Sequence, residues 1–186
     1  MQIADFEIQG QKLNATIKVM FPNLESNEIS MNGTTVMKAV FNGQTGFQSQ
    51  MGQKKEMTAE ELAEKKEKKG LFEQLYYSGS KLDVVGTAKV GTADAYQVKI
   101  TSASGKPATE YYNVKSGLLV KEEKATKTNG TEVIEVTEYN DYRKVGNILL
   151  PYIINKSIQT PQGNQEFVIT VKEVKINTEF KAADFI

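Results

Sequence analysis

The chain has 186 residues, a length typical of one domain that can bury a sizeable core. Its 23 basic and 23 acidic residues balance, which excludes the charge signature of a protein that binds nucleic acid or an anionic membrane. The sequence contains no Cys and no His, so disulfides, thiol nucleophiles, the commonest metal ligand and the commonest general base are all excluded. No apolar run is long enough for a transmembrane helix.

The N-terminal residues, MQIADFEIQ, have no basic segment and no apolar signal core. Ile3, Phe6 and Ile8 instead indicate a strand that begins almost at residue 1. This beginning favours a mature fragment or an excised domain of a longer protein, in which Met1 is an added start residue.

Period-two alternation dominates the next part of the chain. Every second residue from Leu13 to Phe21 is apolar, which indicates a half-buried strand. Three Asn-Gly pairs predict two-residue hairpin turns, because both central residues of such a turn need a positive φ. These pairs stand at residues 32–33, 42–43 and 129–130.

Residues 58–77, TAEELAEKKEKKGLFEQLYY, interrupt the β pattern with a helix signal. Thr58 and Glu61 form a capping box, and Glu61 and Lys65 form a well-oriented i,i+4 pair. Gly70 predicts a break or a kink. We expect the charged first half to lie in solvent and the apolar second half to lie on the sheet.

Further alternating runs between turn residues predict strands over residues 82–90, 94–101, 108–115, 118–128, 131–139, 147–159 and 165–177. Sequential strands joined by tight turns form an antiparallel meander. A sheet of about ten such strands must curl strongly. The predicted fold is therefore mainly β with one helix: a single domain, residues 1–186, in which a highly curved antiparallel meander of about ten strands carries the helix against its concave face.

One half-helix is too small to cover the apolar face of such a sheet, and an incompletely filled concave face is a ligand cavity or a partner groove. The apolar phases of the strands supply the candidate lining, although the sequence does not separate lining from ordinary core. These residues are Ile17, Val19, Phe21, Val36, Phe47, Ile134, Val136, Ile148, Leu150, Tyr152, Phe167, Ile169 and Val171. The apolar half of the helix supplies a candidate lid: Leu71, Phe72, Leu75 and Tyr76.

Catalytic patterns are missing from the sequence. Paired acids can serve glycoside hydrolysis or calcium binding, but the glutamates of residues 122–138 alternate with lysines and fit the solvated face of exposed strands better. The sequence also lacks GxSxG, SxxK, GxGxxG and Walker patterns. We therefore predict no catalytic residue, no metal site and no cofactor.

Several segments, in order, resemble the half-barrel fold of outer-membrane lipoprotein-sorting (LolA/LolB-like) proteins. They are FPN at 21–23, FNGQTGF at 41–47, LFEQLYY at 71–77, LDVVGTAKVGTADAYQVKI at 82–100, EYYNVKSGLLVKEE at 110–123, YNDYRKVGNILLPYII at 139–154 and VKEVKINTEFKAADF at 171–185. More narrowly, the chain resembles the non-catalytic C-terminal domain of Bacteroidetes zinc-protease-like (insulinase or pitrilysin-type) proteins. The HxxEH zinc motif of such proteins is missing here.

The resemblance implies a non-catalytic binding module of the periplasm or cell envelope, which holds a lipid or lipoprotein acyl chain or an apolar partner segment. The alternative is a structural accessory domain that docks onto protease domains of a parent protein and has no small ligand. A nucleic-acid partner and a transmembrane segment are not expected.

Overall fold

The computed structural model describes residues 1–8, 10–67, 70–102, 105–128, 131–161 and 163–186, and for residues 73, 76, 126–128, 131 and 132 it describes the backbone alone. The helices are α1 (Ala59–Glu67) and the short 3₁₀ helices η1 (Glu73–Tyr76) and η2 (Ala182–Phe185). The strands are β1 (Gln2–Ile8), β2 (Gln11–Met20), β3 (Leu24–Met31), β4 (Thr34–Phe41), β5 (Gly46–Gln50), β6 (Gln53–Glu56), β7 (Lys81–Val90), β8 (Ala93–Thr101), β9 (Pro107–Asn113), β10 (Leu119–Thr128), β11 (Thr131–Val145), β12 (Ile148–Thr160) and β13 (Gly163–Val174).

These strands form one 13-stranded sheet in the order β6-β5-β4-β3-β2-β1-β13-β12-β11-β10-β9-β8-β7. Every strand pair whose register is described is antiparallel. Sheet neighbours are also chain neighbours, except that β1 lies beside β13. The predicted fold class, a mainly β antiparallel meander with one α-helix, is thus confirmed. The strand count exceeds the predicted ten partly because β6, whose four residues are all exposed, carries no apolar alternation.

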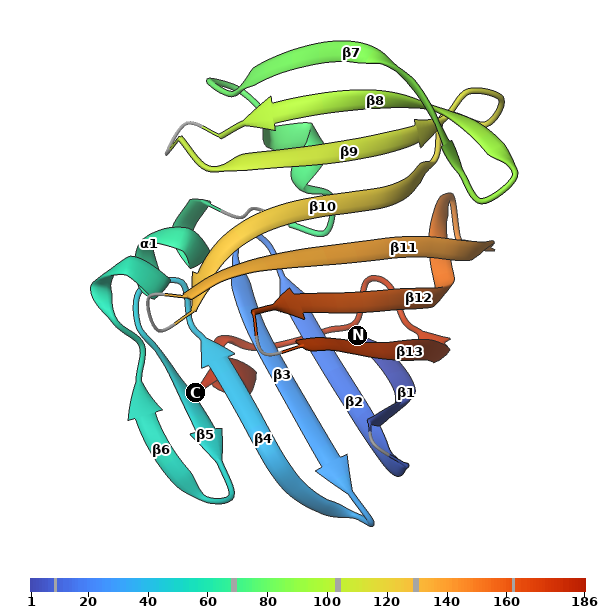
Figure 1. Cartoon of the computed structure of the whole chain (residues 1–186). Coiled ribbons are helices and arrows are strands. Elements are labelled where there is room, and N and C mark those ends of the chain that lie inside the picture. Colours follow the sequence, from blue (N-terminus) through green and yellow to red (C-terminus); the bar gives the residue numbers. More distant parts are fainter. Residues whose placement is uncertain (9, 68–69, 103–104, 129–130, 162) are drawn as a thin grey trace. The chain divides into compact units, whose positions relative to one another are not determined.

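The chain divides into two compact units. The first unit comprises residues 1–76, 144–148 and 170–186, and the second comprises residues 77–143 and 149–169. The first therefore holds β1–β6 with α1, η1 and η2, and the second holds β7–β10 with most of β11 and β12 (Figure 1).

In the first unit, both faces of the sheet are covered. The cross-strand register puts Val19, Glu25 and Phe41 on one face and Ser26 and Val40 on the other. Phe41 is 1% exposed and Val40 is 3% exposed, so neighbouring residues of β4 are buried on opposite faces. The C-terminal segment covers the Val40 face and buries its Phe185 completely.

The Asn32–Gly33 prediction is confirmed. Asn32 and Gly33 have φ values of 50° and 79° and connect β3 to β4 as a two-residue hairpin. The pair at residues 129–130 lies outside the described residues, although β10 and β11 pair on either side of it.

The turn predicted at residues 42–43 is longer than expected. It spans residues 42–45, because the Asn42 Oδ1 atom accepts hydrogen bonds from the backbone N–H groups of Gln44 (3.0 Å) and Thr45 (2.9 Å). An asparagine side chain that closes its own turn removes the need for a two-residue hairpin. β4 and β5 are nevertheless antiparallel neighbours, as predicted.

The helix signal over residues 58–77 corresponds to two separate helices, α1 and η1. The capping box is present: the Thr58 N–H donates to Glu61 Oε2 (2.7 Å), and the Glu61 N–H donates to Thr58 Oγ1 (3.3 Å). Gly70 has a φ of 66°, which ends any regular helix there and accounts for the division. α1 buries no residue fully, in keeping with its charged sequence.

In the second unit, a buried glutamate lies on β9, a strand with neighbours on both sides. The cross-strand register puts Glu110 on the same face as Val98 of β8 and Glu122 of β10. Gln97 and Tyr111 lie on the other face. Glu110 is 1% exposed. The last strand of the sheet on this side, β7, is by contrast exposed along most of its length.

Candidate functional site

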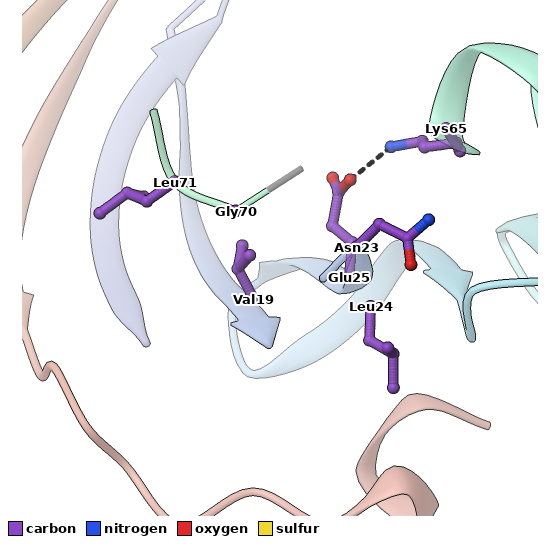
Figure 2. Close-up of a pocket in the computed structure, with 7 residues that line it drawn as sticks. All are labelled: Val19, Asn23, Leu24, Glu25, Lys65, Gly70 and Leu71. Carbon is purple, nitrogen blue, oxygen red and sulfur yellow. Dashed lines mark hydrogen bonds and ion pairs between the residues drawn. The ribbon is translucent and has the colours of Figure 1, made fainter. Parts of the chain in front are cut away.

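A pocket of about 190 Å³ lies in the first unit, over the face of the sheet that carries Val19. Its volume is below the roughly 300–1,000 Å³ typical of sites for drug-sized ligands. The pocket therefore fits one end of an amphiphile or a single side chain, and not a complete lipid. It is lined by Val19, Asn23, Leu24, Glu25, Lys65, Gly70 and Leu71 (Figure 2).

The turn between β2 and β3 builds the floor of the pocket. This turn occupies residues 21–23 and brings Val19 of β2 directly opposite Glu25 of β3. Cross-strand partners share a face of the sheet, so an apolar and an acidic side chain lie next to each other. Leu24 joins the lining at the start of β3.

An ion pair closes one side of the pocket. The Lys65 Nζ of α1 donates to Glu25 Oε2 at 2.7 Å, and the two side chains are 27% and 23% exposed. The second carboxylate oxygen, Glu25 Oε1, accepts a hydrogen bond from the Asn27 side-chain amide. Together with the Gln48–Glu61 hydrogen bond of 3.1 Å, this ion pair holds α1 over β3 and β5.

The segment after α1 supplies the opposite, apolar side (Figure 2). The Gly70 N–H donates to the Pro22 carbonyl oxygen at 2.7 Å, which ties this segment to the β2–β3 turn. Leu71 directly follows Gly70 and lines the pocket, although 53% of its surface is exposed. The pocket is therefore polar on one side and apolar on the other.

One buried polar atom near this pocket has no partner. Among the described residues, the Asn27 Oδ1 is the buried side-chain oxygen or nitrogen that makes no hydrogen bond. Its amide nitrogen is committed to Glu25, so the oxygen points away from that carboxylate. Buried acceptors are normally satisfied, so this oxygen is an exception within the described part of the chain.

The structure brings together only part of the predicted lining. Val19 and the predicted lid residue Leu71 both line the pocket, and Ile17 shares the Val19 face of β2. Phe47 pairs with Val40 and so lies on the opposite face of the sheet. It lines a second pocket, of about 140 Å³, beside Phe185.

The remaining predicted lining residues lie outside these two pockets. Phe21 is 67% exposed and Leu75 is 74% exposed, whereas Val171 is 4% exposed and Leu150 is 9% exposed. The side chain of Tyr76 lies outside what the structure describes. The other predicted lining and lid residues also lie outside both pockets and are half-buried or exposed. They are Val36, Phe72, Ile134, Val136, Ile148, Tyr152, Phe167 and Ile169.

The apolar phases of the strands did not predict the polar side of the pocket. Glu25 and Asn23 are polar, and Lys65 belongs to a charge run that fits a solvated helix face. A turn at Pro22 would have placed Glu25 opposite Val19, so that signal was available. The approach of Lys65, 40 residues away in the chain, had no sequence signal.

The second unit contains a different polar cluster around Glu110. Its Oε1 accepts from the Tyr77 hydroxyl at 2.5 Å, and its Oε2 accepts from the Tyr112 hydroxyl. Burial, followed by the hydrogen bond to Glu110, raises the pKa of both tyrosines. These hydroxyls therefore stay protonated and act as donors, which is a structural role.

No group of His, Cys, Asp or Glu side chains within the described ranges has the arrangement of a metal site. Within the same ranges, no helix is long and apolar enough to cross a membrane.

Comparison with known proteins identifies the fold. A comparison with protein-family models finds no match, and neither does a comparison with curated proteins. Among solved structures, the chain is similar to a LolA-superfamily protein from Nitrosomonas europaea, with a TM-score of 0.65 and 9% identity over 100% of this chain and 87% of that one. It is also similar to a DUF1329-family protein from Desulfovibrio piger (TM-score 0.62, 12% identity, 100% and 87% covered).

A third similar structure is a domain from Vibrio parahaemolyticus whose description refers to outer membrane lipoprotein sorting (TM-score 0.60, 9% identity, 99% and 87% covered). Identities of 9–12% over nearly whole chains show a common fold and no more. The chain therefore has the LolA-like fold that its sequence resembles.

Proposed function

We propose that this chain is a non-catalytic binding module of the cell envelope that holds the apolar end of an amphiphile, such as a lipid or lipoprotein acyl chain. The observation that carries the proposal is the pocket of the first unit, in which Val19 lies beside the Lys65–Glu25 pair and Leu71 lines the other side. An apolar pocket with a few placed polar groups is the usual form of a small-ligand site.

The LolA-like fold supports this proposal and its location in the periplasm, because one similar structure is described as related to lipoprotein sorting. The composition agrees with a role without catalysis, since neither His nor Cys is available as a nucleophile, base or soft metal ligand. Binding of an acyl chain needs only apolar surface and a polar rim.

A binding titration tests the proposal. We expect 1-monolauroyl glycerol, used below its critical micelle concentration, to bind the whole chain saturably in isothermal titration calorimetry. Leu71→Asp should weaken this binding about tenfold or more, because it puts a charge at the apolar side of the pocket. The matched control is Leu75→Asp, which changes an exposed leucine outside the pocket and should leave the affinity unchanged.

Two results would contradict the proposal. One is the lack of saturable binding by the unaltered chain, together with native mass spectra that contain no co-purified lipid. The other is equal binding by the chain and its Leu71→Asp variant, which would separate any lipid binding from this pocket.

A second candidate function is a docking domain within a zinc-protease-like parent protein. It is favoured by β7, an outer strand of the sheet whose Leu82, Val84 and Val85 are 49%, 70% and 46% exposed. Outer strands normally avoid exposed apolar side chains, because free backbone groups there accept a further strand. By contrast β6, the strand at the other end of the sheet order, has no apolar residue.

The reading frame upstream of residue 1 tests this second candidate. An in-frame protein with an HxxEH motif would support the docking domain. A frame that starts nearby with a lipoprotein leader would instead favour the acyl-chain carrier.

A further inference from the structure

We infer that Glu25 makes the pocket selective for acyl chains that end in an uncharged ester or amide carbonyl, and that it disfavours free fatty-acid anions. The inference rests on the proposed function, because it names the chemical class that the same pocket accepts. It follows from the arrangement of Glu25 and Lys65 on the polar side (Figure 2).

The Lys65 ammonium can recognise a carbonyl oxygen. An ammonium has three N–H donors, and within the described part of the chain Lys65 hydrogen-bonds only to Glu25 Oε2. Two donors therefore remain for a ligand that enters the pocket. The apolar side chains of Val19, which shares a face of the sheet with Glu25, and of Leu71 would meanwhile contact the first methylene groups of the acyl chain.

The Glu25 carboxylate removes the advantage that an anionic ligand would gain from Lys65. Its two oxygens are occupied, one by Lys65 and one by the Asn27 amide, so it is held in place beside the ammonium. Both charges are about three-quarters shielded from solvent, at 23% and 27% exposure. A second carboxylate at Lys65 would lie a few ångströms from the first, and like charges at that distance repel strongly when partly desolvated.

A neutral carbonyl escapes this penalty. An ester or amide oxygen accepts a hydrogen bond from Lys65 without bringing a second negative charge. An anion must either separate the Lys65–Glu25 pair or bind beside it. The selectivity thus comes from the repulsion between the Glu25 carboxylate and an anionic ligand. Specific binding sites often discriminate by such repulsion.

Three lauroyl ligands of equal chain length test this inference: 1-monolauroyl glycerol (an ester), an N-lauroyl dipeptide amide (an amide) and laurate (a carboxylate). We expect the unaltered chain to bind the ester and the amide about tenfold or more tightly than laurate at pH 7. The ester and amide arms also distinguish a glycerolipid from an acylated polypeptide as the source of the acyl chain.

Two variants separate the roles of the ion pair. Glu25→Gln keeps the shape of the side chain but removes its charge, so it should tighten laurate binding about tenfold and change ester binding about threefold at most. Lys65→Met should weaken the binding of all three ligands, because it removes the ammonium that donates to them. Lys66→Met, on an exposed lysine of the same helix with no part in the pocket, is the matched control and should change nothing.

The outcomes distinguish this inference from the proposed function. If none of the three ligands binds, both are overturned. The inferred selectivity is overturned if laurate binds the unaltered chain as tightly as the ester does. It is also overturned if Glu25→Gln leaves the ratio of the laurate and ester affinities unchanged. In both cases the proposed binding of acyl chains is retained. Circular dichroism of each variant confirms that its fold is intact, and the Lys65→Met result remains informative if Glu25→Gln does not fold.

Discussion

Glu25 in the first unit and Glu110 in the second both project from a strand inside the sheet, but their surroundings differ. Glu25 is 23% exposed, pairs with a lysine and lines a pocket. Glu110 is 1% exposed, accepts hydrogen bonds from the hydroxyls of Tyr77 and Tyr112, and lines neither pocket. An accessible ion pair suits ligand recognition, whereas a closed carboxylate–hydroxyl cluster suits structural stabilisation.

The largest effect should come from the closed cluster. Glu110→Leu leaves the Tyr77 and Tyr112 hydroxyls without their acceptor, and each buried unsatisfied hydroxyl costs about 1–3 kcal/mol. We expect the free energy of unfolding, measured in urea, to fall by about 4 kcal/mol. Glu166→Leu, at an exposed glutamate of β13, is the control. A loss below about 1 kcal/mol would mean that Glu110 does not have a structural role.

The corresponding change in the first unit concerns the C-terminal segment. Phe185 is fully buried and contacts Phe180 edge to face, with ring centroids 5.8 Å apart. Phe185→Ala should lower the free energy of unfolding by about 3 kcal/mol, whereas Ile186→Ala, at a residue that is 78% exposed, should not.

The same two variants test the prediction that residues 1–186 form a single domain. If they do, Glu110→Leu and Phe185→Ala should each shift one common unfolding transition. Two separate transitions in differential scanning calorimetry, each sensitive to one variant, would show that the two compact units unfold independently.

The second unit should also lose stability at alkaline pH. Burial raises the pKa of Tyr142, whose hydroxyl donates to the Leu119 carbonyl oxygen at 2.5 Å, to about 12. The pKa of this tyrosine in the unfolded chain is about 10. The protonated Tyr142 hydroxyl therefore contributes fully to the free energy of unfolding below pH 10, and this contribution is lost as the pH rises to about 12. The full shift corresponds to about 3 kcal/mol, and because the Tyr142 side chain is only half-buried, the loss should amount to roughly 2 kcal/mol.

Tyr142→Phe provides the check on this pH dependence. Urea titrations at several values from pH 8 to about pH 11 should show a shallower decline for the variant than for the unaltered chain. Parallel declines would place the titrating group elsewhere, with Tyr77 and Tyr112 as the next candidates, because burial also raises their pKa.

The smallest effect should appear at α1 in the first unit. The Thr58 backbone N–H is the main reason that the pKa of Glu61 is lowered. Thr58→Ala removes the Thr58 hydroxyl that caps the Glu61 N–H and should cost about 1 kcal/mol. Hydrogen exchange of the α1 amides is the measurement, with Thr178→Ala as an exposed control. Unchanged exchange would show that the Lys65–Glu25 and Gln48–Glu61 contacts, and not the Thr58 hydroxyl, hold the helix.

The sequence predicted much of the fold because local rules govern it. Period-two alternation located most strands, the Asn32–Gly33 pair located a hairpin, and Thr58 with Glu61 located the start of α1. These signals depend on residues within a few positions of each other. The turn at residues 42–45 departed from the prediction because the Asn42 side chain closes it by hydrogen bonds.

The candidate pocket could be predicted only in part. Val19 and Leu71 were among the predicted lining and lid residues, but Phe47 lies on the opposite face of the sheet. Alternation shows which residues of one strand share a face. It does not show which face of the next strand lies beside them, because that depends on the length of each turn.

The sequence by itself thus determined an antiparallel β fold and excluded His- and Cys-based chemistry. Only the tertiary structure decided that Lys65 meets Glu25 and that Glu110 is enclosed by two tyrosines. The physical reason is separation along the chain: Lys65 and Glu25 are 40 residues apart, and Tyr77 and Glu110 are 33 residues apart. Contacts at such distances depend on strand register and on the path of intervening segments, which no local pattern encodes.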